Sequence, residues 1–382
     1  MDPKRSQPIK ISSSVKNYQG HLSRADLLGD PQGVVKVSPN AQDPNERRKS
    51  SLEETYVHGA PLGGGNANHG APIKKILIVG AGAVGGYFGG LLSKSGADVT
   101  FMVRPETCRR ISQNGLVVKS VNGDFTVHPP LIQHASEIAS ADLIILTVKC
   151  YDVGSVLGEV APLVKKGGTI LTLQNGVDTE ERVLSYFQED CLVAGVAYIT
   201  ARLAEPGVVE HYRRGMIGLG EWSGEKSVRA TEIYQILSKA GIDCNLTGRI
   251  RQAKWEKLCW NATFNPLSVV LDHPISMVLE SPPLLDVVRE GISEIIRVAA
   301  AEGIEIKPGM IEETISVSHQ FREFHTSMYE DFKNGKPTEI EHLNGDLLRR
   351  GKKAGVPTPT HQVLYALVKG LEVKRRLQAG SH

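Results

Sequence analysis

Three polar side chains are spaced four residues apart in an otherwise apolar segment: Lys257, Asn261 and Asn265. In an α-helix this spacing puts them along one face, with a drift of about 40 degrees per step. The positions from Trp255 to Leu271 are mainly apolar, so we expect a buried helix whose polar stripe faces another polar group. An ammonium placed there could donate a proton or stabilise an oxyanion. The alternative is a stripe that faces solvent, where Lys and Asn are common.

A glycine-rich loop follows a short apolar run that begins near residue 75. The loop has the GxGxxG pattern and consists of Gly80, Ala81, Gly82, Ala83, Val84 and Gly85. In such a loop the first glycine permits a tight turn, the second lets the backbone approach a pyrophosphate, and the third allows strand and helix to pack closely. Because the motif lies between a strand-like run and a helical stretch, it predicts a dinucleotide site rather than an ordinary glycine-rich turn.

The next apolar run, residues 98–103, is followed by Arg104. An NAD site usually has a carboxylate here, about 20 residues after the loop, which binds the ribose hydroxyls. An arginine can pair with a 2′-phosphate, whereas an aspartate would repel it. The sequence therefore favours NADP, in its reduced form NADPH, as the cofactor. The alternative is that Arg104 is an ordinary surface arginine.

Two further polar residues, Lys149 and Asn175, each follow an apolar run. They are expected at the carboxyl ends of strands, where open α/β sheets place their ligands. We therefore expect both to border the nicotinamide or the substrate. The alternatives are an exposed lysine at a strand end and a turn at Asn175–Gly176.

The elements that must position these side chains divide the chain into two folded regions. Short apolar runs alternate with helix-length segments over residues 73–247, which predicts an α/β fold: an N-terminal Rossmann-type, doubly wound parallel sheet that binds NADP. Over residues 248–378 the apolar residues follow helical spacing, which predicts an all-helical C-terminal domain for substrate and catalysis. We expect the active site between the two.

Residues 1–72 differ from the rest of the chain. They contain no Phe, Trp or Cys and are rich in Ser, Pro, Gly and Asn, so they are expected to form a disordered extension. Nine basic and seven acidic residues in this segment are unlike the acid-poor composition of a transit peptide. A cytoplasmic protein is therefore expected, with organelle targeting as a minority alternative.

The composition excludes several classes of protein. The 44 basic residues are nearly balanced by 42 acidic ones, so no global basic field would attract nucleic acid. Five cysteines without a CxxC pair fit neither a disulfide framework nor a zinc cluster, and the histidines are too scattered to suggest a metal site. The longest uncharged stretch, residues 76–93, is diluted by glycines and is not expected to span a membrane.

Taken together, these motifs resemble those of the ketopantoate reductase (2-dehydropantoate 2-reductase) family. The resemblance covers the chain from about residue 74 to its end. Besides the loop and Arg104, it rests on Val148-Lys149-Cys150, Leu173-Gln174-Asn175-Gly176, residues 205–209, residues 217–221, residues 255–261, Asn265-Pro266-Leu267, and Ser327 with Thr338-Glu339-Ile340.

The resemblance implies an NADPH-dependent reduction of ketopantoate to pantoate, on the route to pantothenate and coenzyme A. It implies that Lys257 is the general acid and that Glu339 hydrogen-bonds the substrate hydroxyl and helps to hold the lysine in place. Glu339 is also expected to contact the cofactor. A lysine with an ordinary pKa of about 10.4 already carries the necessary proton at neutral pH. The resemblance further implies substrate contacts from Asn261, Asn265 and Ser327. Without it, nothing distinguishes Glu339 from its neighbour Glu341.

One departure leaves the substrate open. The family often has an asparagine after the catalytic helix, where this chain has Ile275. The alternatives are therefore a related NADP-dependent dehydrogenase for another 2-oxo acid or an opine-type substrate, and a non-catalytic protein that senses NADP. The expected partner is a small 2-oxo acid, with a homodimer as an option.

Overall fold

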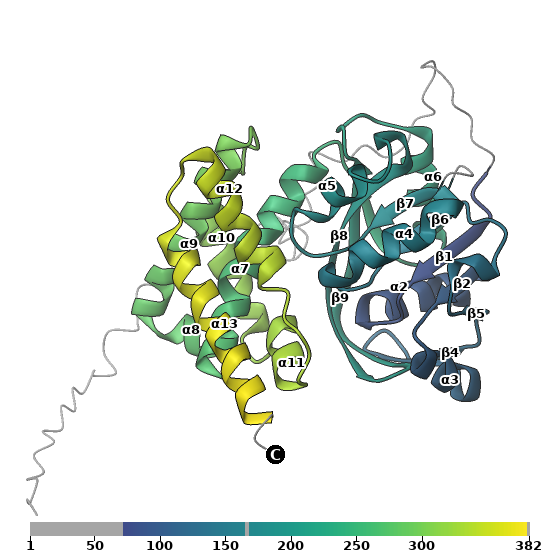
Figure 1. Ribbon diagram of the computed structural model, residues 1–382, viewed down its shortest axis with the longest axis horizontal. Helices are drawn as coiled ribbons and strands as arrows, with labels where there is room; N and C mark the ends of the chain where they lie inside the picture. The colour runs from purple at the N-terminus through teal and green to yellow at the C-terminus, as the bar shows by residue number, and fades with distance from the viewer. Residues whose placement is uncertain (1–71, 165–167, 380–382) are drawn as a thin grey trace, which may run out of the picture. The chain divides into compact units, whose positions relative to one another are not determined.

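The computed structural model describes residues 72–164 and 168–379, which form a ten-stranded sheet followed by a series of helices (Figure 1). The extension predicted for residues 1–72 lies outside the described residues, apart from residue 72.

Six strands of the sheet run parallel to one another. They are β1 (Lys75–Val79), β2 (Asp98–Met102), β5 (Leu131–Ile132), β6 (Leu143–Leu146), β7 (Thr169–Thr172) and the start of β8 (Leu192–Glu205). Their order across the sheet is β5-β2-β1-β6-β7-β8, which is the order 3-2-1-4-5-6 of dinucleotide-binding folds. The order reverses between β1 and β6, where such sheets bind their ligand. The predicted Rossmann-type fold is confirmed.

The sheet extends beyond this parallel part through a long hairpin. Strand β8 pairs antiparallel with β9 (Val208–Glu221), and β9 also pairs in parallel with β3 (Leu116–Ser120) and β10 (Asp243–Leu246). Strand β4 (Phe125–Val127) completes this edge, antiparallel to β3. The sheet is therefore mixed, and the parallel arrangement expected from the sequence describes its nucleotide-binding half.

Helices pack on both faces of the parallel strands. Because side chains alternate along a strand, Ile76 and Ile78 join one apolar cluster and Leu77 joins another. The first cluster includes Phe88 of α2 (Ala83–Lys94), and the second includes Leu157 of α4 (Val153–Val164). Apolar side chains on both faces explain why this strand reads as a continuous apolar run. The other helices of this half are α3 (Pro105–Asn114), α5 (Thr179–Leu184) and α6 (Val228–Lys239).

Residues 250–379 contain helices and no strand in the described structure (Figure 1). The first helix, α7 (Ile250–Leu271), packs against five of the others. The others are α8 (Ser276–Glu280), α9 (Pro282–Ala301), α10 (Met310–Ser318), α11 (Ser327–Lys333), α12 (Asp346–Ala354) and α13 (Pro359–Ala379). Over the described ranges, no helix combines the length and apolar character that a membrane crossing requires.

We predict that Gly85→Ala destabilises the protein whereas Gly82→Ala does not. A Cβ atom at Gly85 would lie 2.1 Å from the Gly80 carbonyl oxygen and 2.2 Å from the Thr147 hydroxyl, so α2 would have to move away from β1. Overpacking of this kind costs about 1–3 kcal/mol. A Cβ atom at Gly82 would meet nothing within 4 Å. Thermal unfolding of both variants measures the difference, and equal melting temperatures would contradict the packing argument.

Candidate active site

The side-chain amide of Asn175 connects three other residues that the sequence singled out. Asn175 lies just beyond the carboxyl end of β7. Its Oδ1 accepts hydrogen bonds from Lys257 Nζ at 2.8 Å and from Asn261 Nδ2 at 3.2 Å. Its Nδ2 donates to Glu339 Oε2 at 3.2 Å. One amide thus joins the sheet, helix α7 and the segment that precedes α12.

Lys257 reaches this amide from α7, where the spacing of four places it one turn before Asn261. Its ammonium also donates to the backbone carbonyl of Ala197 in β8, at 2.6 Å, and lies 5.8 Å from the centre of the Tyr198 ring. An ammonium has three N–H groups. Since these two oxygens are its hydrogen-bond acceptors among the described residues, a third N–H can serve a ligand.

The environment of Lys257 changes its acidity. Burial, and then the neighbouring charge of Lys254, lower the pKa of Lys257 to about 8, against the opposing effect of the Glu339 carboxylate. The ordinary lysine pKa expected from the sequence therefore does not apply. A group with a pKa near 8 is still mainly protonated at neutral pH, and it gives up its proton more readily than an ordinary lysine.

Glu339 is held as a carboxylate on the other side of Asn175. It is 5% exposed, and its Oε1 accepts the backbone N–H of Cys150 at 3.0 Å. Burial by itself would raise the pKa of Glu339, but the charge of Lys149 and the hydrogen bonds from Cys150 and Asn175 bring it below its ordinary value. A π-helical turn, Glu341–Gly345, follows directly, a distortion that is frequent at functional sites.

The structure also shows that Glu339 and Glu341 have different partners, which the sequence alone could not show. The Glu341 carboxylate accepts a hydrogen bond from the Tyr365 hydroxyl at 2.6 Å and pairs with Arg349 at 2.5 Å. Its partners thus lie on α12 and α13 rather than at Asn175. The backbone turn between the two glutamates sends their side chains to different environments.

Lys149 connects the network to α11. Its Nζ lies 2.5 Å from Asp331 Oδ2. Burial lowers the pKa of Lys149, but the carboxylates of Glu339 and Asp331 outweigh it and raise the pKa above the ordinary value. Lys149 therefore remains a cation, in contrast to the more acidic Lys257.

Two predicted substrate residues do not join the Asn175 network. Ser327 is the exposed first residue of α11, and Asn265 is 1% exposed, one turn beyond Asn261. Asn265 Oδ1 is buried without a hydrogen-bond partner among the described residues. Their contacts with a substrate remain predictions.

The glycine loop has the shape that a dinucleotide requires. Gly80 has a φ of +99°, which an L side chain rarely adopts, and the space around Gly82 is open. Helix α2 begins at Ala83 with no acidic residue in its first turn, so its positive end is free to face a pyrophosphate. Together with Ala81 and Val84, these residues fit the diphosphate of a nicotinamide dinucleotide.

Arg104 lies two residues beyond the end of β2 and directly before α3, close to where the sequence indicated. Its side chain is 78% exposed, and one guanidinium nitrogen lies 2.7 Å from Asp152 Oδ2. An exposed ion pair of this kind contributes roughly 0–1 kcal/mol, so a 2′-phosphate could take the place of the carboxylate. The arrangement fits NADP, with Asp152 as a competing partner.

Sequence reasoning missed three partners in this region: the Ala197 carbonyl, Asp152 and Asp331. A backbone carbonyl has no signal in the sequence. Asp331 did have one, because it lies four residues after Ser327 and so shares a helical face with a residue already singled out.

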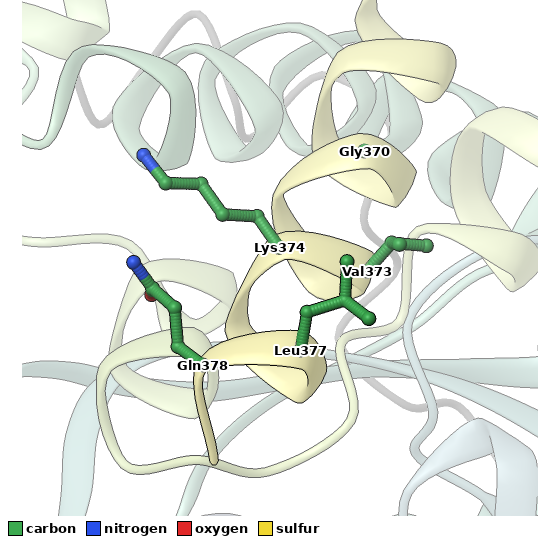
Figure 2. A pocket seen from close by; sticks show the side chains of 5 residues that line it. All are labelled: Gly370, Val373, Lys374, Leu377 and Gln378. Atoms are coloured by element: carbon green, nitrogen blue, oxygen red, sulfur yellow. The ribbon is translucent and has the colours of Figure 1, made fainter. Parts of the chain in front are cut away.

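A shallow hollow on α13 lies outside the Asn175 network. It is lined by Gly370, Val373, Lys374, Leu377 and Gln378 (Figure 2). It contains none of the residues predicted to act on substrate or cofactor. We therefore do not assign the chemistry to this hollow.

Known proteins are similar to this chain in sequence and in fold. A relative from Pyrococcus horikoshii, named 2-dehydropantoate 2-reductase, is 31% identical over 303 residues, which cover 78% of this chain and 97% of the relative. The crystal structure of a 2-dehydropantoate 2-reductase from Geobacter metallireducens is 35% identical with a TM-score of 0.74, and the match covers 78% of this chain and 99% of that one. A ternary complex of D-mandelate dehydrogenase with NADH and anilino(oxo)acetate is 30% identical with a TM-score of 0.75, at the same coverage.

Two family models complete the comparison. The model described as ketopantoate reductase PanE/ApbA matches residues 76–224, and the model of the C-terminal part of the same family matches residues 249–372. Together they cover more than half of the chain, so the chain belongs to the ketopantoate reductase family of NADPH-dependent oxidoreductases.

Proposed function

We propose that this protein reduces ketopantoate to pantoate with NADPH and that Lys257 supplies the proton. The observation that carries the proposal is the position of the Lys257 ammonium. It is held by the Asn175 amide and the Ala197 carbonyl, and its third N–H has no acceptor in the described part of the chain. The name of the Pyrococcus horikoshii relative supports the same substrate.

The chain's own residues would act on the carbonyl oxygen of the 2-oxo acid. NADPH, when bound, supplies the hydride that goes to C2. As negative charge develops on the oxygen, the Lys257 ammonium stabilises it and then transfers a proton, leaving a neutral amine. Asn175 and Ala197 fix the direction of the ammonium throughout. We assign substrate binding to Asn261, Asn265 and Ser327, as the resemblance implies.

Glu339 has two parts in this proposal. Its carboxylate orients the Asn175 amide, because Nδ2 donates to Glu339 and Oδ1 must then face Lys257. Its negative charge also opposes the loss of the Lys257 proton. As the resemblance implies, we assign it a hydrogen bond to the substrate hydroxyl, beside the cofactor.

A second candidate is the reduction of a 2-oxo acid with a more apolar side chain. Ile275, where the family often has an asparagine, is fully buried in the helical core and offers no side-chain hydrogen bond. The similarity to D-mandelate dehydrogenase points in the same direction.

A steady-state comparison of 2-oxo acids tests the proposal. We expect kcat/KM for NADPH oxidation to be higher with ketopantoate than with phenylglyoxylate, the 2-oxo acid related to mandelate, or with pyruvate. A preference for phenylglyoxylate would overturn the substrate assignment in favour of the second candidate. Binding of NADPH without turnover of any of the three would favour a protein that senses the nucleotide.

The pKa of Lys257 predicts a pH dependence for the reduction. The general acid must be protonated, so kcat/KM should be constant below pH 8 and fall about tenfold per pH unit above it. The reverse oxidation needs the neutral amine and should instead rise with pH through the same region. A midpoint near pH 10.4, the value of an ordinary lysine, would contradict the effect of burial.

The matched variants for this profile are Lys257→Met and Lys239→Met. Loss of the general acid should lower kcat by about a hundredfold or more and remove the inflection near pH 8, while NADPH binding is retained. Lys239 lies in the last turn of α6, is exposed, and should be replaceable without effect. Nearly full activity of Lys257→Met would mean that another group delivers the proton.

Arg104 predicts a preference for NADPH over NADH. Replacement of Arg104 by alanine should lower kcat/KM for NADPH by about tenfold or more, because a charge-assisted contact to phosphate is lost, and should leave the value for NADH nearly unchanged. Arg109, another exposed arginine on α3, pairs with Glu106, and Arg109→Ala is the matched control. An equal loss with both cofactors would exclude a contact to the 2′-phosphate.

A homodimer and a cytoplasmic location remain predictions. Support for a dimer comes from large apolar side chains that are exposed along α13: Val363 by 58%, Leu367 by 46%, and Leu377, which lines the hollow of Figure 2, by 68%.

A further inference from the structure

A second lysine on α7 lies close to the site and has no part in the proposed reaction. Lys254 is one turn before Lys257, and its side chain is 1% exposed. Its ammonium lies 2.7 Å from Oε1 of Glu180 in α5, whose side chain is fully buried. The pair joins α7 of the helical part to α5 of the nucleotide-binding part.

A buried ion pair contributes little net stability to a fold. Taking two charges out of water is costly, and apolar residues of similar size often serve as well or better. The pair here is only partly satisfied: the Thr172 hydroxyl donates to Glu180 Oε1 at 2.5 Å, whereas Oε2 is buried without a partner among the described residues. Its position therefore calls for a reason other than stability.

That reason lies in the segment that both lysines contact. Lys254 donates to the backbone carbonyl of Gln174 at 3.3 Å, and Lys257 donates to the side chain of the next residue, Asn175. Residues three apart on a helix are neighbours on its surface. The two ammonium groups are thus held on one face of α7, against two consecutive residues beyond β7.

We propose that Lys254 is a positioning residue of the active site. Paired with Glu180, it holds the Gln174–Asn175 segment against α7 and keeps a positive charge one turn from Lys257, which eases release of the Lys257 proton.

The other titratable and charged groups around Lys257 do not favour the loss of its proton. The Glu339 carboxylate acts in the opposite direction, and the Tyr198 ring presents its face to the ammonium. Burial raises the pKa of the Cys150 thiol well above its ordinary value, so that group is neutral. Lys149 is paired with Asp331, as Lys254 is paired with Glu180, but Lys149 is not a cause of the lowered pKa of Lys257. Among these neighbours, Lys254 is the cation whose charge lowers the pKa of Lys257.

The role of Lys254 in catalysis rests on the proposed function. The test of this inference therefore includes a measurement that does not require turnover. Acetylation of the Lys257 amine in the full-length protein is quantified by mass spectrometry as a function of pH. Its midpoint is the pH at which half of the Lys257 side chains are protonated. The pH profile of kcat/KM with ketopantoate and NADPH gives the catalytic counterpart.

Three variants separate charge from structure. Lys254→Met combined with Glu180→Gln replaces the ion pair by neutral groups and avoids an unpaired buried carboxylate. We expect it to raise the Lys257 midpoint from the value near 8 by more than about 0.3 of a pH unit. Lys254→Arg keeps the charge and should keep the midpoint. Lys239→Met, on the exposed surface of α6, should have no effect.

The outcomes distinguish this inference from the proposed function. A purely structural pair would change the melting temperature of the double variant and leave the Lys257 midpoint within about 0.3 of a pH unit, which would overturn the inference. If the acetylation midpoint shifts but the kcat/KM profile does not follow, Lys254 acts on Lys257 as proposed and the general-acid assignment fails instead.

Discussion

The site depends on one hydrogen bond, from the Lys257 ammonium to the side chain of Asn175. An ammonium that is removed from water requires oxygen acceptors, and each acceptor restricts its direction. Here the acceptors come from the loop after β7 and from β8, whereas the lysine comes from α7. The nucleotide-binding sheet and the helical part therefore both contribute to the surroundings of this ammonium.

The surrounding charges adjust this group in opposite directions. Burial and Lys254 favour the neutral amine, and Glu339 favours the ammonium. The result is a lysine that still holds its proton at neutral pH and can release it to an oxyanion. Lys149 is only partly buried, and the charges of two nearby carboxylates raise its pKa. Two lysines in one region thus differ in acidity because their neighbours differ.

The nucleotide side of the protein depends on backbone geometry more than on charge. A turn with positive φ at Gly80 and the close approach of strand and helix at Gly85 bring the start of α2 to the switch point of the sheet. These requirements are local, which explains why the glycine pattern predicted them well. The cofactor preference is less local, because Arg104 meets Asp152 from a different loop.

The sequence by itself determined the two folded parts, the glycine loop and the helical stripe of Lys257 and Asn261, because these depend on short-range periodicity and on the conformations open to glycine. Only the tertiary structure decided which residues meet. It placed Glu339 rather than Glu341 at Asn175, supplied the Ala197 carbonyl, and paired Lys254 with Glu180. The physical reason is that hydrogen-bond partners and pKa values depend on groups far apart in the chain, whose proximity is set by the packing of α7 against the sheet.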